Sequence, residues 1–162
     1  MGSLANFEGT ITYGQFFNDG GVFTPIAGGF LPIPFEPMLL KGLHKNCYSV
    51  DDGGFRIGVA QAGAYFVDLS FTADSGDDRA YTLKGYTSLN GGADTPLSGS
   101  RQIEFFQQVV EQKYEVSYNT IVELEKGEEL AWYIKVGTLS AKTLQLLDIK
   151  LVIWSLQQLG QK

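Results

Sequence analysis

One histidine and one cysteine lie close together and are the first residues to consider for chemistry. His44 and Cys47 are separated by Lys45 and Asn46, and the chain has no other histidine or cysteine. A cysteine or serine nucleophile needs a base to take its proton, and a third group usually orients that base. No third member stands beside this pair in the sequence. We therefore expect no catalytic residues and no enzymatic activity, with both side chains in an ordinary strand or loop.

The same pair is also short of ligands for a transition metal. His44 and Cys47 supply two ligands of a tetrahedral zinc site, and only Asp51 and Asp52 stand nearby. A lone cysteine cannot form a disulfide within the chain, so the sequence carries no sign of an oxidising compartment. We expect neither a metal nor a cofactor at this position.

A short acidic segment at residues 74–78 is the other candidate for chemistry. Asp74, Asp77 and Asp78 surround Ser75 and Gly76, and such carboxylates are suitable ligands for Ca²⁺. The segment lacks the longer loop and the distal bidentate glutamate of a dedicated calcium site. Asp, Ser and Gly are also common in solvated turns for backbone reasons alone. We expect a turn, and calcium binding stays an open alternative.

The composition limits the class of protein. The 162 residues include 12 basic and 18 acidic ones, a formal net charge of −6, and no basic stripe of the kind that binds nucleic acid. Residues 1–8 lack the basic start and apolar run of a secretory signal, and no apolar run is long enough to cross a membrane. We expect a single soluble domain that binds neither nucleic acid nor membrane.

Alternating apolar and polar residues predict three strands, at 64–73, 114–124 and 130–136. Successive side chains of a strand point to opposite faces, so each segment has one core face. In the second segment the core face carries Val116, Tyr118, Val122 and Leu124. The core residues predicted in the first and third segments are Tyr65, Val67, Leu69, Phe71, Trp132 and Ile134.

Weaker patterns predict further strands at 13–17, 31–35, 55–59, 80–88 and 144–156. Pro32 and Pro34 cannot donate ladder hydrogen bonds, so 31–35 is expected at an edge or as an irregular extended segment. The spacing in 103–111 fits a helix or a bulged strand, and the neighbouring strands favour a strand. Many short strands separated by turns indicate an all-β sandwich or jelly roll.

The order of the motifs resembles a known family. The motifs are YGQFF at 13–17, LPIPF at 31–35, FRI at 55–57, AGAYFVDLS at 62–70, TIVELEKGEEL at 120–130 and LVIW at 151–154. Together they resemble the jelly roll of the tumour-necrosis-factor and complement globular-head superfamily, closest to its microbial and bacteriophage branch. The resemblance implies a TNF-like jelly-roll domain at residues 13–162, preceded by an arm at 1–12.

The resemblance also implies a homotrimer, in which the sheet that holds both termini packs around a three-fold axis. Leu147, Ile149, Leu151 and Ile153 alternate on one face of the C-terminal strand, which is expected to be the core face. Apolar residues on the opposite faces of their strands are then candidate subunit contacts, or partly exposed surface groups. The candidates are Phe66, Ile121, Val152 and Trp154.

Three classes of function follow. The first is a structural protein of a virus particle, a trimeric capsid decoration protein or knob located in the virion. Its arm at 1–12 and the loop at 19–29 would then bind a viral capsid or fibre protein. The second is a receptor-binding or carbohydrate-binding head, in which Phe23, Phe30 and Tyr86 stack on a host surface glycan unless they are buried. The third, an enzyme, is disfavoured by the single histidine.

Overall fold

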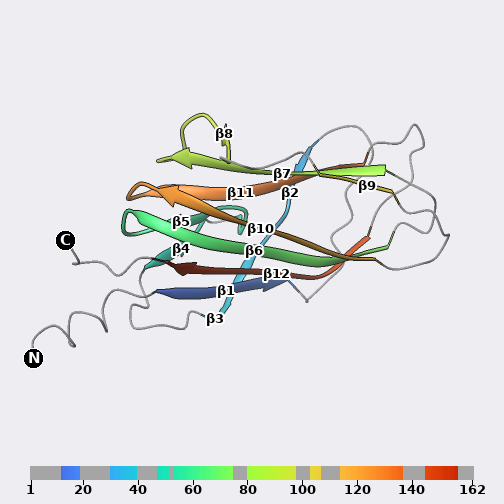
Figure 1. Cartoon of the computed structure of the whole chain (residues 1–162), viewed down its shortest axis with the longest axis horizontal. Coiled ribbons are helices and arrows are strands. Elements are labelled where there is room, and N and C mark those ends of the chain that lie inside the picture. The colour runs from blue at the N-terminus through green and yellow to red at the C-terminus, as the bar shows by residue number, and fades with distance from the viewer. Residues whose placement is uncertain are drawn as a thin grey trace, which may run out of the picture.

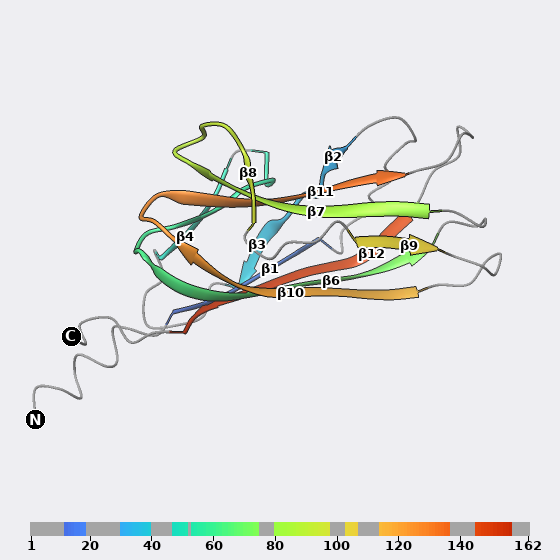
Figure 2. The same ribbon diagram turned by 45° about the horizontal axis from the view of Figure 1, so that its top comes forward.

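Two antiparallel β-sheets face each other in the computed structural model (Figures 1 and 2), which describes residues 12–18, 30–39, 47–51, 53–74, 80–97, 103–106, 114–136 and 145–156. The five-stranded sheet contains, in spatial order, β10 (Tyr114–Leu124), β6 (Gly63–Asp74), β12 (Gln145–Ser155), β1 (Tyr13–Asn18) and β3 (Glu36–Leu39). The seven-stranded sheet contains β4 (Tyr48–Val50), β5 (Ile57–Val59), β11 (Glu128–Val136), β7 (Ala80–Leu89) and β8 (Thr95–Pro96), with β2 (Leu31–Pro32) beside β11 and β9 (Ile103–Phe106) beside β7.

The core lies between the two sheets and is made by the predicted faces of the long strands. The described core face of β10 is buried as predicted, at Val116, Tyr118, Val122 and Leu124. Side chains that each sheet turns inward interdigitate in the space between the layers, as in other β-sandwiches. Six further predicted core side chains are each at most 3% exposed: Tyr65, Val67, Leu69, Phe71, Trp132 and Ile134.

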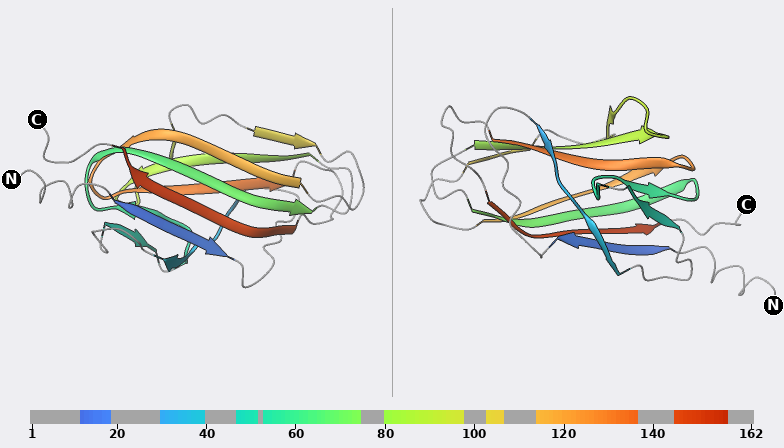
Figure 3. Two further views of the ribbon diagram at one scale, coloured as in Figure 1. Left: turned by 60° about the horizontal axis from the view of Figure 1, so that its bottom comes forward. Right: turned by 180° about the vertical axis from the view of Figure 1, so that it is seen from behind.

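The proline-containing segment crosses from one sheet to the other. β2 pairs with β11 and β3 pairs with β1, so the chain between them runs diagonally over the open side of the sandwich (Figure 3, right). Ile33 and Phe35 are fully buried there, and the Ile33 N–H donates to the Trp132 carbonyl at 2.8 Å. The alternating prolines have no N–H to satisfy, which is why this irregular extended segment tolerates them.

A β-bulge in β12 makes one prediction wrong. The register of β12 on β6 shifts between Leu147 and Lys150, and Asp148 adopts a left-handed φ of 52°. The extra residue reverses the alternation, so Leu146 and Ile149 are fully buried and Leu147 is half-buried. The predicted core position of Leu147 therefore belongs to Leu146. The alternation in the sequence could not predict this change of face, because the residue types around the bulge are the same as those of a regular strand.

Short strands account for the other differences. β3, β4 and β8 were not predicted, and the strand expected at 55–59 begins only at Ile57. Asp51 explains the late start, since its Oδ1 accepts the N–H groups of Phe55 at 2.6 Å and Arg56 at 3.1 Å and so closes a turn. The ambiguous segment is a strand over Ile103–Phe106, and residues 107–111 lie outside the described residues.

A tight turn joins β10 to β11 in the GEEL-containing motif. Gly127 has a φ of +82° and donates its N–H to the Val59 carbonyl at 2.8 Å. The Glu128 side chain accepts the N–H of Glu125 at 2.9 Å, which closes the turn from the other side. A Cβ on Gly127 would lie 2.8 Å from the Asn90 amide oxygen, which is the end of a side chain that can turn away, so the positive φ is what requires glycine here.

Replacing Leu69 or Ile134 with alanine is expected to lower the free energy of unfolding by roughly 2–5 kcal/mol, because each change removes buried methyl groups and leaves a cavity. Chemical denaturation at a fixed protein concentration measures this loss. Asn119→Ala, on the exposed face of β10, is the control and should change the value by under about 0.5 kcal/mol. A Leu69→Ala loss as small as that of the control would contradict the assigned core.

Gly54→Ala is expected to destabilise the protein more than Gly91→Ala. Both glycines have nearly the same φ, +73° and +74°, so both substitutions carry the left-handed penalty of roughly 1–2 kcal/mol. A Cβ on Gly54 would also lie 2.6 Å from the Phe35 carbonyl oxygen, whereas at Gly91 the nearest atom is 4.0 Å away. Thermal unfolding of the two variants, measured under the same conditions, isolates the effect of this contact. Equal losses of stability would show that the crossing segment moves away from the new Cβ without destabilising the protein.

Candidate functional site

Four neighbouring strands place four large side chains in one row across the outer face of the five-stranded sheet. Phe66 of β6 pairs with Ile121 of β10 on one side and with Trp154 of β12 on the other, and Trp154 pairs with Tyr13 of β1. Directly paired residues project from the same face of a sheet. We call these four residues the apolar row. It runs from β10 to β1 on the face turned toward the viewer in Figure 3, left.

The centre of the apolar row is a stacked aromatic pair. The rings of Phe66 and Trp154 lie 4.5 Å apart between centroids, with an interplanar angle of 28°. Both side chains are only half-buried, and Ile121 at the edge strand is 60% exposed. Val152, the fourth predicted contact residue, lies one step along the sheet, opposite Asp68 and Gln15. The structure therefore brings all four predicted contact residues to one face.

The same face becomes polar beyond the apolar row. Ser117 pairs with Ser70, which in turn pairs with Lys150. The Ser117 hydroxyl also donates to the Asp68 carboxylate at 3.3 Å. The bulge adds a shallow depression at this end, lined in part by Ser70 and Asp148. The apolar row is thus a band on this face, bordered by groups that water can solvate.

The environment of Cys47 does not support nucleophilic chemistry. Its side chain is buried, and burial raises the pKa of the thiol, which disfavours the reactive thiolate. Burial, with a smaller contribution from Cys47, also raises the pKa of Tyr65 to about 12. His44, Asp52 and residues 75–78 lie outside the described residues. Within the described part of the chain, no three His, Cys, Asp or Glu side chains gather in a way that could hold a metal ion.

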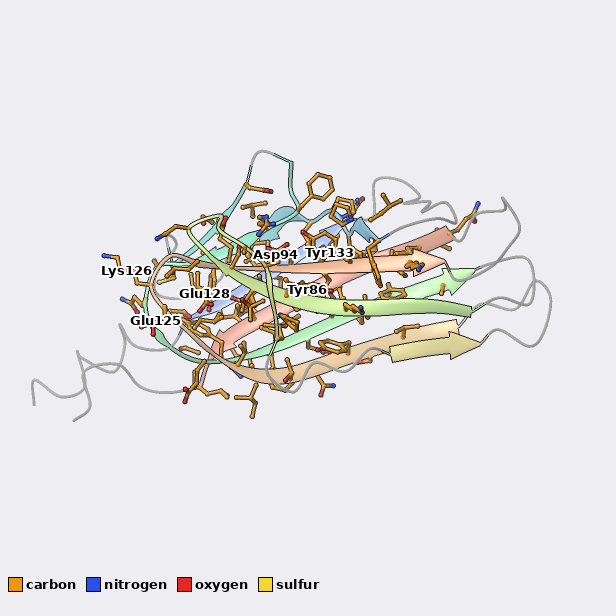
Figure 4. The ribbon with its side chains drawn as sticks, turned by 90° about the horizontal axis from the view of Figure 1, so that it is seen from above. Tyr86, Asp94, Glu125, Lys126, Glu128 and Tyr133 are labelled. Atoms are coloured by element: carbon orange, nitrogen blue, oxygen red, sulfur yellow. The ribbon has the colours of Figure 1, made fainter. Side chains whose placement is uncertain are left out.

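A hydrogen-bonded network covers the outer face of the seven-stranded sheet. The Arg56 guanidinium donates to both carboxylate oxygens of Asp94, at 3.0 and 3.2 Å, and to the Ser88 hydroxyl at 2.6 Å. The Tyr133 hydroxyl donates to Asp94 at 3.1 Å, and the Tyr133 ring meets Tyr86 edge-on at 5.4 Å. Figure 4 shows Tyr86, Tyr133 and Asp94 gathered along β7 and β11. We call Arg56, Ser88, Asp94 and Tyr133 the Arg56 network.

At Arg56 the hydrogen bond to Asp94 outweighs burial, which by itself would lower the pKa. The hydrogen bond to Asp94 is the main cause that raises the pKa of Arg56 above its ordinary value. Burial, followed by the Asp94 charge, raises the pKa of Tyr133. The Arg56 guanidinium therefore stays charged, and its hydrogen bonds to Asp94 hold the segment after β7 against the sheet. Tyr86 was a predicted glycan contact and Arg56 belongs to the FRI motif, but Arg56 and Asp94 are 38 residues apart and no spacing in the sequence links them.

No helix in the described part of the chain has the length and apolar character needed to cross a membrane. In the comparison with sequences, no family model and no curated protein matches the chain.

The comparison with solved structures identifies the fold. The chain is similar to Eiger TNF from S. frugiperda, with a TM-score of 0.66 and 11% identity over 94% of this chain and 96% of that one. It is also similar to murine APRIL, with a TM-score of 0.59 and 12% identity over 90% of this chain and 99% of that one. At such low identity the likeness establishes the architecture alone. The chain is an all-β jelly-roll sandwich of the TNF-like type.

Proposed function

We propose that the protein is a non-enzymatic homotrimeric knob, a capsid decoration or cement protein of a bacteriophage particle. The observation that carries the assembly is the apolar row, in which a stacked Phe66–Trp154 pair and a 60% exposed Ile121 lie on one sheet face. Large aromatic side chains are enriched at the centres of protein interfaces, where they bury much apolar area. A covering subunit would remove this surface from water.

The layout of the row favours a ring. Ile121 lies on β10, at the edge of the sheet, while Phe66 and Trp154 lie on the interior strands β6 and β12. An edge of one subunit packed on the sheet face of the next is a head-to-tail contact, and such contacts close into rings when the rotation permits. TNF-like folds commonly form homotrimers, which supports three as the number of subunits.

The place in a virus particle is supported by the order of the sequence motifs, which resembles that of the bacteriophage branch. The arm at 1–12 and the loop at 19–29, proposed to bind a capsid or fibre protein, lie outside the described residues except for Thr12. The direct test is quantitative mass spectrometry of purified particles. A stoichiometric amount of this chain relative to the capsid protein supports the proposal, and its absence overturns it.

A second function is favoured by the opposite sheet. Tyr86 and Tyr133 lie side by side on the seven-stranded sheet, which a trimer built on the apolar row leaves facing outward. Aromatic side chains with a few placed polar groups beside them also line many ligand-binding sites. The alternative is therefore a receptor-binding or carbohydrate-binding head. Binding on a glycan array favours this function over a purely structural one.

Trp154→Glu or Phe66→Asp is expected to convert the trimer into a monomer or an aggregate, because each change places a charge in an apolar contact. Sedimentation equilibrium gives the mass, and circular dichroism checks the fold. Leu89→Glu is the matched control, since Leu89 is 49% exposed on the other sheet and its variant should stay trimeric. A wild-type chain that is monomeric and soluble at about micromolar concentration would refute the assembly.

His44→Ala and Cys47→Ser are expected to leave association with particles unchanged wherever the variant folds, since Cys47 is buried and no third catalytic residue stands beside the pair in the sequence. Co-sedimentation of each variant with particles that lack the native chain measures association, and thermal unfolding reports the stability of the Cys47 variant, whose site is buried. A hydrolytic activity in the wild type that disappears in a folded His44→Ala variant would instead identify an enzyme.

A further inference from the structure

An exposed phenylalanine on the outer side of the seven-stranded sheet has two lysines around its ring. The Lys84 ammonium lies 4.6 Å from the Phe30 ring centroid, and that of Lys135 lies 5.7 Å from it. Phe30 is 36% exposed and the adjacent Leu31 is 37% exposed. Neither lysine forms an ion pair with a carboxylate of the described residues, among which Arg56 pairs with Asp94. Two positive charges therefore converge on one apolar spot.

This spot continues into the Arg56 network. Lys84 of β7 is directly opposite Tyr133 of β11, so the two side chains project from the same face. Tyr133 in turn donates to Asp94, which is already neutralised by Arg56. One surface therefore joins two ammonium groups, the rings of Phe30, Tyr86 and Tyr133, and a fixed polar cluster in which Arg56 balances Asp94. The Glu129 carboxylate lies beyond Arg56 on the same face, opposite Ser88.

We propose that this surface binds an acidic saccharide, a uronic or sialic acid residue within a glycan. The sugar carboxylate would lie between Lys84 and Lys135, where two ammonium groups can donate to its oxygens. The C–H face of the sugar ring would contact the exposed aromatic rings, whose faces carry negative charge. The hydroxyl groups would reach the Arg56 network, whose geometry is set before the ligand arrives, so little ordering is needed on binding.

The charge distribution selects an acidic ligand over a neutral one. The chain has a net charge of −6, so an anion is repelled by most of the molecule and attracted only where cations gather. The ammonium groups lie partly in solvent, so the attraction is screened and binding should weaken as salt increases. This inference rests on the second proposed function and names its ligand class and site. It does not depend on the trimer, which uses the opposite sheet.

The test uses the full chain and defined probes in isothermal titration calorimetry. The acidic probes are tetragalacturonate, a hyaluronan tetrasaccharide and a sialic acid trimer, and the neutral probe is the methyl ester of tetragalacturonate. We expect at least one acidic probe to bind. If tetragalacturonate binds, its methyl ester should bind at least about tenfold more weakly than the free acid. No binding by any acidic probe at about 10 mM, or equal binding of tetragalacturonate and its ester, would overturn the proposal.

Variants then locate the site. Lys84→Gln combined with Lys135→Gln should weaken binding of the acidic probe at least about tenfold, and Phe30→Ser should weaken it as well. Lys126→Gln, at the exposed β10–β11 turn, is the matched control and should bind as the wild type does. Unchanged binding by the double lysine variant would overturn the site.

The mass of every sample in solution separates the two proposals. A trimer without binding overturns only the saccharide site. Binding by a monomer overturns only the assembly.

Discussion

The pairing of β6 between β10 and β12 is the constraint on which the rest of the structure depends. β6 is registered against β10 from Gly63 to Ala73 and against β12 on its other side, so three long strands share one set of faces. Every second residue of β6 is thereby committed to the core, and the alternate residues are committed to the outer face. A slip of one residue would exchange Leu69 for a polar neighbour and turn the apolar row inward.

The crossing segment and the bulge adapt this regular sheet to a closed sandwich. Ile33 and Phe35 fill the open side of the core. They lie between β2 and β3, where the chain passes from one sheet to the other. The bulge at Asp148 lets β12 bury Leu146 and Ile149 on both sides of a change in register. Both features place apolar side chains in parts of the core that strict alternation would leave empty. In return, each segment forms fewer hydrogen bonds with neighbouring strands.

The two outer faces of the sandwich differ in chemistry, and each of the two proposed functions uses one of them. The five-stranded sheet presents an apolar band, which water solvates poorly and which the proposed trimer would cover. The seven-stranded sheet presents aromatic rings among charged groups that are already hydrogen-bonded, which suits a small polar ligand. Because the faces lie on opposite sides of the core, self-association through one leaves the other accessible (Figure 2).

The sequence by itself determined the long strands and the side to which each residue points, because alternation with a period of two is a local property. The burial of Leu69 and Ile134 and the outward position of Phe66 and Trp154 follow from that pattern. Only the tertiary structure decided which outward residues become neighbours, since pairing between distant strands sets the order of Ile121, Phe66, Trp154 and Tyr13. The same holds for Arg56 with Asp94 and for Lys84 with Phe30: their contacts join distant segments, and no spacing in the chain records them.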